Sequence, residues 1–139
     1  MEPKKISYVR LVKSEDLNHH GTLFAGRCAE WFVEAGFIAV ASLLPTQNIV
    51  CLKIHGLEFS YPLRLGQIAQ FTSKVVYAGK TSIKVYVELT PVDEQSIAVS
   101  GFITFVYIDK DGKPKPHGLS LELSNENDLK LNKIAGVLK

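Results

Sequence analysis

Residues 82–90 show a regular alternation of apolar and polar positions. Such a period of two is typical of a strand with one face against a core and the other toward water. The apolar face would carry Ile83, Val85, Val87 and Leu89, and the opposite face Ser82, Lys84, Tyr86 and Glu88.

Four further segments read as strands because they are rich in β-branched and aromatic residues and are bounded by turn residues. Residues 96–108 are apolar on both faces, which is typical of a central strand. Turns are indicated at 79–81, 91–95 and 109–114. The other three predicted strands are residues 5–13, 48–59 and 67–78.

A long helix is predicted from Ala25 to Leu44, because this segment is rich in Ala, lacks alternation and stops at Pro45. Apolar residues occupy most of its circumference, so we expect other parts of the protein to cover it on nearly all sides. Arg27, Glu30 and Glu34 interrupt this pattern and fall within about 60° of one another on the helix. Carboxylates on a buried helix are costly unless they meet water, a partner or a substrate.

These elements predict an α+β protein in which an antiparallel sheet of about five strands wraps around one long central helix. The 139 residues suit one domain, with a polar, weakly helical tail at about 119–139 lying at the periphery. Such a domain leaves two sheet edges and part of the helix uncovered. Pairing two copies edge to edge would cover an edge of each, so we expect at least a homodimer.

Composition narrows the possible functions. Charges are dispersed, with a net charge of only +2, so no basic stretch indicates nucleic-acid binding. The N-terminal segment is too polar for a signal peptide, and the helix carries too many charges for a membrane span, which favours a cytoplasmic protein. Cys28 and Cys51 stand in apolar surroundings and are expected to be buried free thiols.

Four motifs together resemble the hot-dog-fold acyl-CoA thioesterases. "NHHGTLFAG" at residues 18–26 is similar to the family's N-x-x-G-x-x-F-G-G signature. "LEFSYPLRLG", "VVYAGKTSIKVYV" and "FVYIDKDGKPKP" are similar to its later F-x-x-P, G-x-T-S and D-x-x-G-K-P stretches. The commonest members of the family have an Asp seven positions after the second Gly of the signature. This chain has Val33 at that position and Glu34 at the next one. It also has Ala25 in the Gly pair and His55 where an Asp is frequent.

The resemblance implies hydrolysis of an acyl-CoA thioester without a cofactor or a metal. It places the catalytic carboxylate at Glu34, with Glu30 as the alternative, acting as general base or as nucleophile. The N–H groups of Ala25 and Gly26 at the helix start would stabilise the oxyanion, and Asn18 would orient water or the thioester oxygen. A structural interpretation also fits, in which Arg27 pairs with Glu30, Glu34 lines a dimer groove and Asn18 is a turn or cap residue.

The resemblance also places contacts to coenzyme A near the turn at 79–82, although an ordinary hairpin turn with solvated lysines fits as well. His19 and His20 lack a third ligand at a metal-binding spacing. A hot-dog hydroxyacyl-CoA/ACP dehydratase and a non-catalytic acyl-CoA-binding module are the alternative functions, and an assembly of three dimers is a family possibility. The candidate coenzyme A contacts are Gly79, Lys80, Thr81, Ser82, Arg64 and Lys113, with Lys84 nearby.

Overall fold

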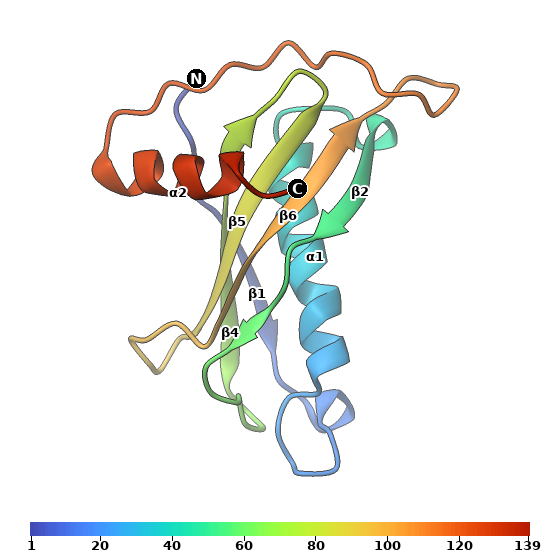
Figure 1. The fold of residues 1–139 in the computed structure, drawn as a ribbon. Helices are drawn as coiled ribbons and strands as arrows, with labels where there is room; N and C mark the ends of the chain where they lie inside the picture. The colour runs from blue at the N-terminus through green and yellow to red at the C-terminus, as the bar shows by residue number, and fades with distance from the viewer.

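The computed structural model describes residues 1–139 and contains one antiparallel sheet between two helices of unequal length (Figure 1). Five strands are paired in the order β1-β4-β5-β6-β2, and the two-residue strand β3 also pairs with β6. The predicted five strands and the helix are therefore present. The strands are β1 Ile6–Leu11, β2 Ile49–Ile54, β3 Glu58–Phe59, β4 Ile68–Ala78, β5 Ser82–Pro91 and β6 Val99–Tyr107.

Strand β5 confirms the face assignment made from its alternation. All four apolar side chains of the predicted inner face, from Ile83 to Leu89, are buried in the main core. The outer-face residues Ser82, Tyr86 and Glu88 are half-buried. Lys84 differs from its neighbours, because it is only 8% exposed beneath the C-terminal helix.

The predicted strand at 48–59 is two strands. Gly56 has φ +105°, a left-handed conformation that a continuous strand does not accommodate, and it separates β2 from β3. Its carbonyl oxygen lies against Gly101 of β6, where an added Cβ would collide with it. A glycine is therefore required at 101 for the chain to bend past β6.

Helix α1, Ala25–Ala41, crosses one face of the sheet and contacts mainly β4 and β5. It ends three residues before the predicted Leu44, where the Ser42 hydroxyl donates to the Ala39 carbonyl (2.7 Å) ahead of Pro45. The side toward the sheet is buried, whereas Glu34 and Ile38 on the opposite side are exposed. Coverage on nearly all sides is therefore not achieved within one chain, because a single sheet face covers only one stripe of a helix.

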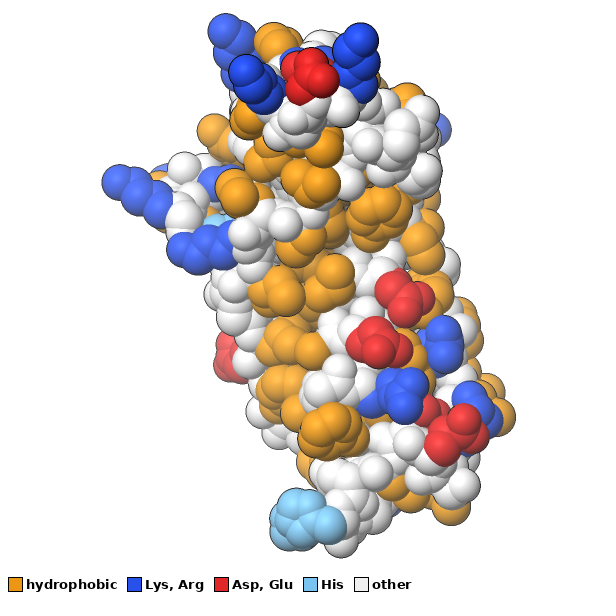
Figure 2. All heavy atoms as spheres, turned by 90° about the vertical axis from the view of Figure 1, so that its right-hand side faces the viewer, with side chains coloured by type: hydrophobic (Ala, Val, Ile, Leu, Met, Phe, Trp, Pro, Cys, Tyr) orange, Lys and Arg blue, Asp and Glu red, His pale blue; other side chains and the backbone are white.

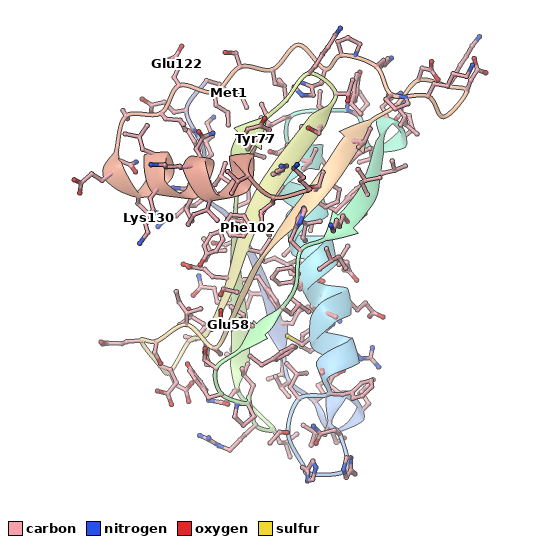
Figure 3. The ribbon with its side chains drawn as sticks, in the orientation of Figure 1. Met1, Glu58, Tyr77, Phe102, Glu122 and Lys130 are labelled. Atoms are coloured by element: carbon pink, nitrogen blue, oxygen red, sulfur yellow. The ribbon has the colours of Figure 1, made fainter.

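Helix α2, Glu126–Gly136, packs on the opposite face of the sheet. Its Leu131 and Ala135 form a small cluster with Val76, against which Tyr77 and Phe102 pack (Figure 3). The tail expected at the periphery therefore contains an amphipathic helix that shields the outer face of β4 and neighbouring strands.

Two lysines from the sheet fix this helix at its two ends. Lys74 Nζ lies 2.6 Å from the buried Asp128 carboxylate in the first turn of α2. Lys84 Nζ donates to the carbonyls of Ala135 and Leu138 at 2.8 and 2.7 Å, where the helix dipole favours a cation. Burial lowers the pKa of Lys84 below 10.5.

Strand β2 leaves an apolar edge uncovered. Val50, Leu52 and Ile54 are 41%, 66% and 42% exposed. Figure 2 shows an almost continuous hydrophobic stripe on this side of the molecule, flanked by charged groups. Cys28 is buried as predicted, but Cys51 is exposed, because β2 is an edge strand in the single chain. Neither helix has the length and hydropathy needed to cross a membrane.

Candidate active site

A tight loop built on Asn18 leads into α1. The Asn18 side-chain oxygen accepts hydrogen bonds from the backbone N–H groups of His20 (2.9 Å) and Thr22 (3.1 Å). Its amide nitrogen donates to the Thr22 hydroxyl at 3.0 Å. Asn18 therefore organises the loop, as the structural interpretation expected, and one amide hydrogen remains for a further acceptor.

The start of α1 presents free backbone donors. Phe24 is the N-cap and provides no side-chain cap, so the N–H groups of Ala25, Gly26 and Arg27 have no acceptor within the chain. Ala25 and Gly26 are exposed. A Cβ at Gly26 would lie 2.6 Å from Cε2 of Phe24, so the glycine lets this ring fold over the helix start. The arrangement offers dipole-assisted N–H groups to an anionic oxygen.

Asp16 contacts the start of α1 through Arg27, although the sequence pattern did not single it out. This carboxylate is only 2% exposed and accepts a hydrogen bond from the Lys13 N–H at 2.9 Å. Arg27 Nε lies 3.5 Å from Asp16, and Arg27 Nη1 lies 3.7 Å from Glu30. The predicted Arg27–Glu30 pair is therefore present, with Asp16 as a second anion for the guanidinium. An acid in the turn before a helix was the available sequence signal.

Glu34 is exposed on the outward side of α1, and its partner is Tyr8 of β1. The Tyr8 hydroxyl donates to Glu34 Oε2 at 2.7 Å, and Arg10 Nη1 donates to the Tyr8 oxygen at 2.9 Å. Burial raises the pKa of Tyr8 above 10.0, and the hydrogen bond to Glu34 adds to this increase. Neither Tyr8 nor Arg10 was a predicted site residue. The sequence signal that could have found them was their spacing of two after Ile6. This spacing places the polar ends of Tyr8 and Arg10 on the same face of the strand as Ile6.

Glu34 and the helix start are too far apart to act together within one chain. Glu34 is nine positions after Ala25 on the helix, which corresponds to a rise of roughly 14 Å at 1.5 Å per residue. A general base reaches its target directly or through one water, at about 3 Å per hydrogen bond. Within one chain, Glu34 is therefore out of reach of a carbonyl group held at its own helix start.

The candidate coenzyme A residues also divide between two ends of the molecule. Arg64 pairs through the backbone with Thr22 and so lies beside the Asn18 loop. The turn at 79–82 lies at the other end of the sheet, where the backbone N–H of His117 donates to the Lys80 carbonyl and the loop carrying Lys113 follows β6. Basic side chains gather at this upper end in Figure 2. Lys84, buried under α2, is a structural residue and not a free phosphate contact.

Gly79 leaves room in this turn for the Ser82 hydroxyl, which would lie 2.6 Å from an added Cβ and would have to rotate away. The Gly79 N–H donates to the Ser82 carbonyl, and the Thr81 carbonyl accepts from Tyr107. Lys80 is exposed, and the hydroxyl groups of Thr81 and Ser82 belong to half-buried residues. The structure thus accommodates either an ordinary hairpin turn or a ligand contact here.

His55 lies away from the helix start, whereas His19 and His20 lie in the loop that precedes it. His55 contacts the Thr104 hydroxyl at 2.6 Å on the sheet face that carries α2, and desolvation lowers its pKa below 6.5. His19 and His20 are exposed in the Asn18 loop, with ring centroids 3.9 Å apart. The chain holds no cluster of three or more His, Cys, Asp or Glu side chains arranged to bind a metal ion.

Comparison with known proteins identifies the family. A sequence model of the thioesterase superfamily matches residues 20–98, which run from the Asn18 loop through α1 to the end of the β5–β6 connection. The chain belongs to the thioesterase superfamily. Among thioesterase relatives, it is 27% identical over 105 residues to YkhA of Bacillus subtilis, described as an uncharacterized acyl-CoA thioester hydrolase. This match covers 73% of the chain and 60% of that relative's length.

Solved thioesterase structures share the fold over nearly the whole chain. An acyl-CoA hydrolase of Staphylococcus aureus, described in complex with butyryl coenzyme A and coenzyme A, has a TM-score of 0.83 at 27% identity. That similarity covers 95% of this chain and 79% of the other. A hexameric acyl-CoA thioesterase without ligand has a TM-score of 0.86 at 26% identity, covering 95% of this chain and 86% of the other. The predicted hot-dog fold is therefore confirmed.

Proposed function

We propose that this protein hydrolyses the thioester of an acyl-CoA to a free acid and coenzyme A, without a cofactor. The observation that carries the proposal is the exposed start of α1, with uncapped N–H groups at Ala25 and Gly26 in a chain of the thioesterase superfamily. The relatives described as acyl-CoA hydrolases support acyl-CoA as the substrate class.

Thioester chemistry suits a site with few functional groups. The leaving thiolate belongs to a thiol with a pKa of about 8.5, so it departs without strong acid assistance. The N–H groups at the helix start would stabilise the negative charge that develops on the carbonyl oxygen. Glu34 would deprotonate the attacking water, whose oxygen bonds to the carbonyl carbon as the C–S bond breaks.

A complete site requires two copies of the chain. The separation of roughly 14 Å along α1 keeps Glu34 away from the amides of its own helix start. We therefore assign each site to the helix start of one protomer and Glu34 of its partner. The apolar, unpaired edge of β2 supports a two-fold dimer through this strand, since uncovered edges favour pairing.

The same symmetry would unite the two groups of coenzyme A candidates. Antiparallel pairing of two β2 edges turns one protomer end for end relative to the other. The end that carries Lys80 and Lys113 would then lie on the same side of the dimer as the partner's helix start and Arg64. Basic groups at that position would suit the phosphates of coenzyme A.

The decisive assay follows the ultraviolet absorbance of the thioester with acyl-CoA substrates of several chain lengths. This readout avoids thiol dyes, which would react with the exposed Cys51. Glu34→Gln should lower kcat by about 10²–10⁴-fold, the usual contribution of a general base. Glu30→Gln is the matched control, one helical turn away, and should keep most of the activity.

The outcomes separate the possible functions. Loss of activity in Glu30→Gln with retention in Glu34→Gln would move the catalytic role to Glu30. Binding of acyl-CoA without hydrolysis at any chain length would overturn the proposal and indicate a binding module.

A further inference from the structure

We infer that Tyr8 is a positioning residue for Glu34 and that Arg10 holds the phenol oxygen of Tyr8 in place. The inference rests on the proposed function, because it gives Tyr8 a role only through the carboxylate that acts on the thioester. Its physical basis is a three-membered chain of hydrogen bonds from Arg10 through Tyr8 to Glu34, with donor–acceptor distances of 2.9 and 2.7 Å.

The donor inventory makes this chain directional. A guanidinium has only donors, so the bond between Arg10 Nη1 and the Tyr8 oxygen uses the phenol as acceptor. The single O–H of Tyr8 is then left for Glu34 Oε2. Reversal of this first bond would require Arg10 to accept a hydrogen bond, which it cannot do. An ionised carboxylate also has only acceptor oxygens, so the phenol hydrogen points to Glu34 while Arg10 anchors the phenol oxygen from the other side.

The two strand residues are themselves held by packing. Ile6, Tyr8 and Arg10 share the face of β1 that looks toward α1, since side chains alternate along a strand. The Tyr8 ring lies 5.8 Å from the Phe71 ring, and the Arg10 guanidinium carbon lies 5.0 Å from the Trp31 ring centroid. Aromatic and cation–π contacts thus restrict the Tyr8 and Arg10 side chains before Glu34 is engaged.

Glu34 lacks such packing of its own. It is exposed on the outward side of α1, where an unbound Glu samples several rotamers. The bond to Tyr8 engages Oε2, whereas Oε1 has no hydrogen-bond partner within the chain. The carboxylate is thereby oriented with one oxygen tethered and one available for water, as a positioned general base requires.

Tyr8→Phe tests the inference because it removes the hydroxyl and keeps the ring that packs on Phe71. We expect kcat to fall about ten-fold with KM unchanged, the size expected for losing one hydrogen bond to a charged group. Tyr61→Phe is the matched control. It removes a hydroxyl that donates to the Ser96 carbonyl at 2.6 Å, and it should leave kcat unchanged.

A double-mutant cycle distinguishes positioning from general packing. Arg10→Met should also lower kcat, because the phenol oxygen loses the donor that anchors it. If the residues act in series, Tyr8→Phe with Arg10→Met should be no slower than Tyr8→Phe alone. Multiplying effects on kcat, or a rise in KM in place of a fall in kcat, would overturn the inference.

A readout independent of turnover uses the phenol itself. The difference in alkaline absorbance titration between the parent and Tyr8→Phe isolates Tyr8 from the other tyrosines. The same difference in the Glu34→Gln background should give a lower Tyr8 pKa, because the anion no longer disfavours the phenolate. An unchanged Tyr8 pKa would show that the hydrogen bond is absent in solution.

If Glu34→Gln keeps full activity, the proposed function of Glu34 fails, whereas an active Tyr8→Phe beside an inactive Glu34→Gln refutes only the role of Tyr8.

Discussion

Ala25→Pro removes one candidate oxyanion donor and leaves the helix in place. Ala25 is the first helical residue, a position where proline is favoured because its missing N–H has no intrahelical acceptor. Phe24 before it has φ −63° and ψ 130°, an extended conformation that a following proline accepts. Ala25 is also exposed, which leaves room for the pyrrolidine ring.

The expected effects on stability and on catalysis are therefore of different size. The free energy of unfolding should stay constant or rise by about 0.4–1 kcal/mol, because proline restricts the unfolded chain. Loss of one oxyanion donor should raise the barrier by about 3–4 kcal/mol and lower kcat by about 10²–10³-fold. Thermal melting with circular dichroism measures the first quantity, and loss of thioester absorbance at saturating acyl-CoA measures the second.

Mixing variants then tests the shared site. Ala25→Pro and Glu34→Gln damage different halves, so a mixed dimer contains one intact site. Refolding the two together in equal amounts should restore about one quarter of the parent activity for a two-fold dimer. A stable Ala25→Pro protein with kcat within about three-fold of the parent would refute the role given to this N–H group. Two inactive variants that fail to complement each other would refute the division of the site between protomers.

Three other measurements probe the scaffold. Lys74→Met should lower the free energy of unfolding, measured in urea, by about 3–5 kcal/mol, because Asp128 stays buried without its cation. The double variant with Asp128→Leu should recover most of this loss. A thiol reagent should label Cys51 in the native protein and Cys28 only after unfolding, as detected by peptide mass analysis. The reason is that burial raises the pKa of Cys28 to about 12. Rapid labelling of Cys28 in the native protein would contradict its burial. The free energy of unfolding of the parent, relative to that of Lys84→Met, should rise with pH below 10.5. The reason is that the folded-state pKa of Lys84 is lowered, so the unfolded chain holds more protons than the folded chain between the two pKa values. A difference in the free energy of unfolding that stays constant or falls from pH 7 to 10 would contradict this sign.

Local patterns in the sequence were enough to predict most of the sheet. The alternation through β5 identified its buried face correctly, and Pro45 located the end of α1 to within three residues. The division of residues 48–59 was missed because it depends on the left-handed conformation of Gly56. A glycine within an apolar run indicates such a bend only when the neighbouring strand is known.

The site was predicted less completely because it combines distant parts of the chain. The motif indicated the helix start and Glu34, both of which are exposed in the fold. The hydrogen bond from Tyr8 joins residues that are 26 positions apart, and only the sheet order brings β1 alongside α1. Lys84 was interpreted as a phosphate contact because sequence alone does not show that α2 folds back over it.

The position of β2 next to β6 affects how the chain folds during synthesis. Residues 49–54 leave the ribosome about fifty residues before the end of β6, with which they pair in register. At 5–20 residues per second, this apolar segment waits roughly 3–10 s without its neighbour. Loop closure of this length also makes the pairing slow compared with helix formation. Nascent chains should therefore depend on chaperone protection most strongly in the interval before β6 emerges.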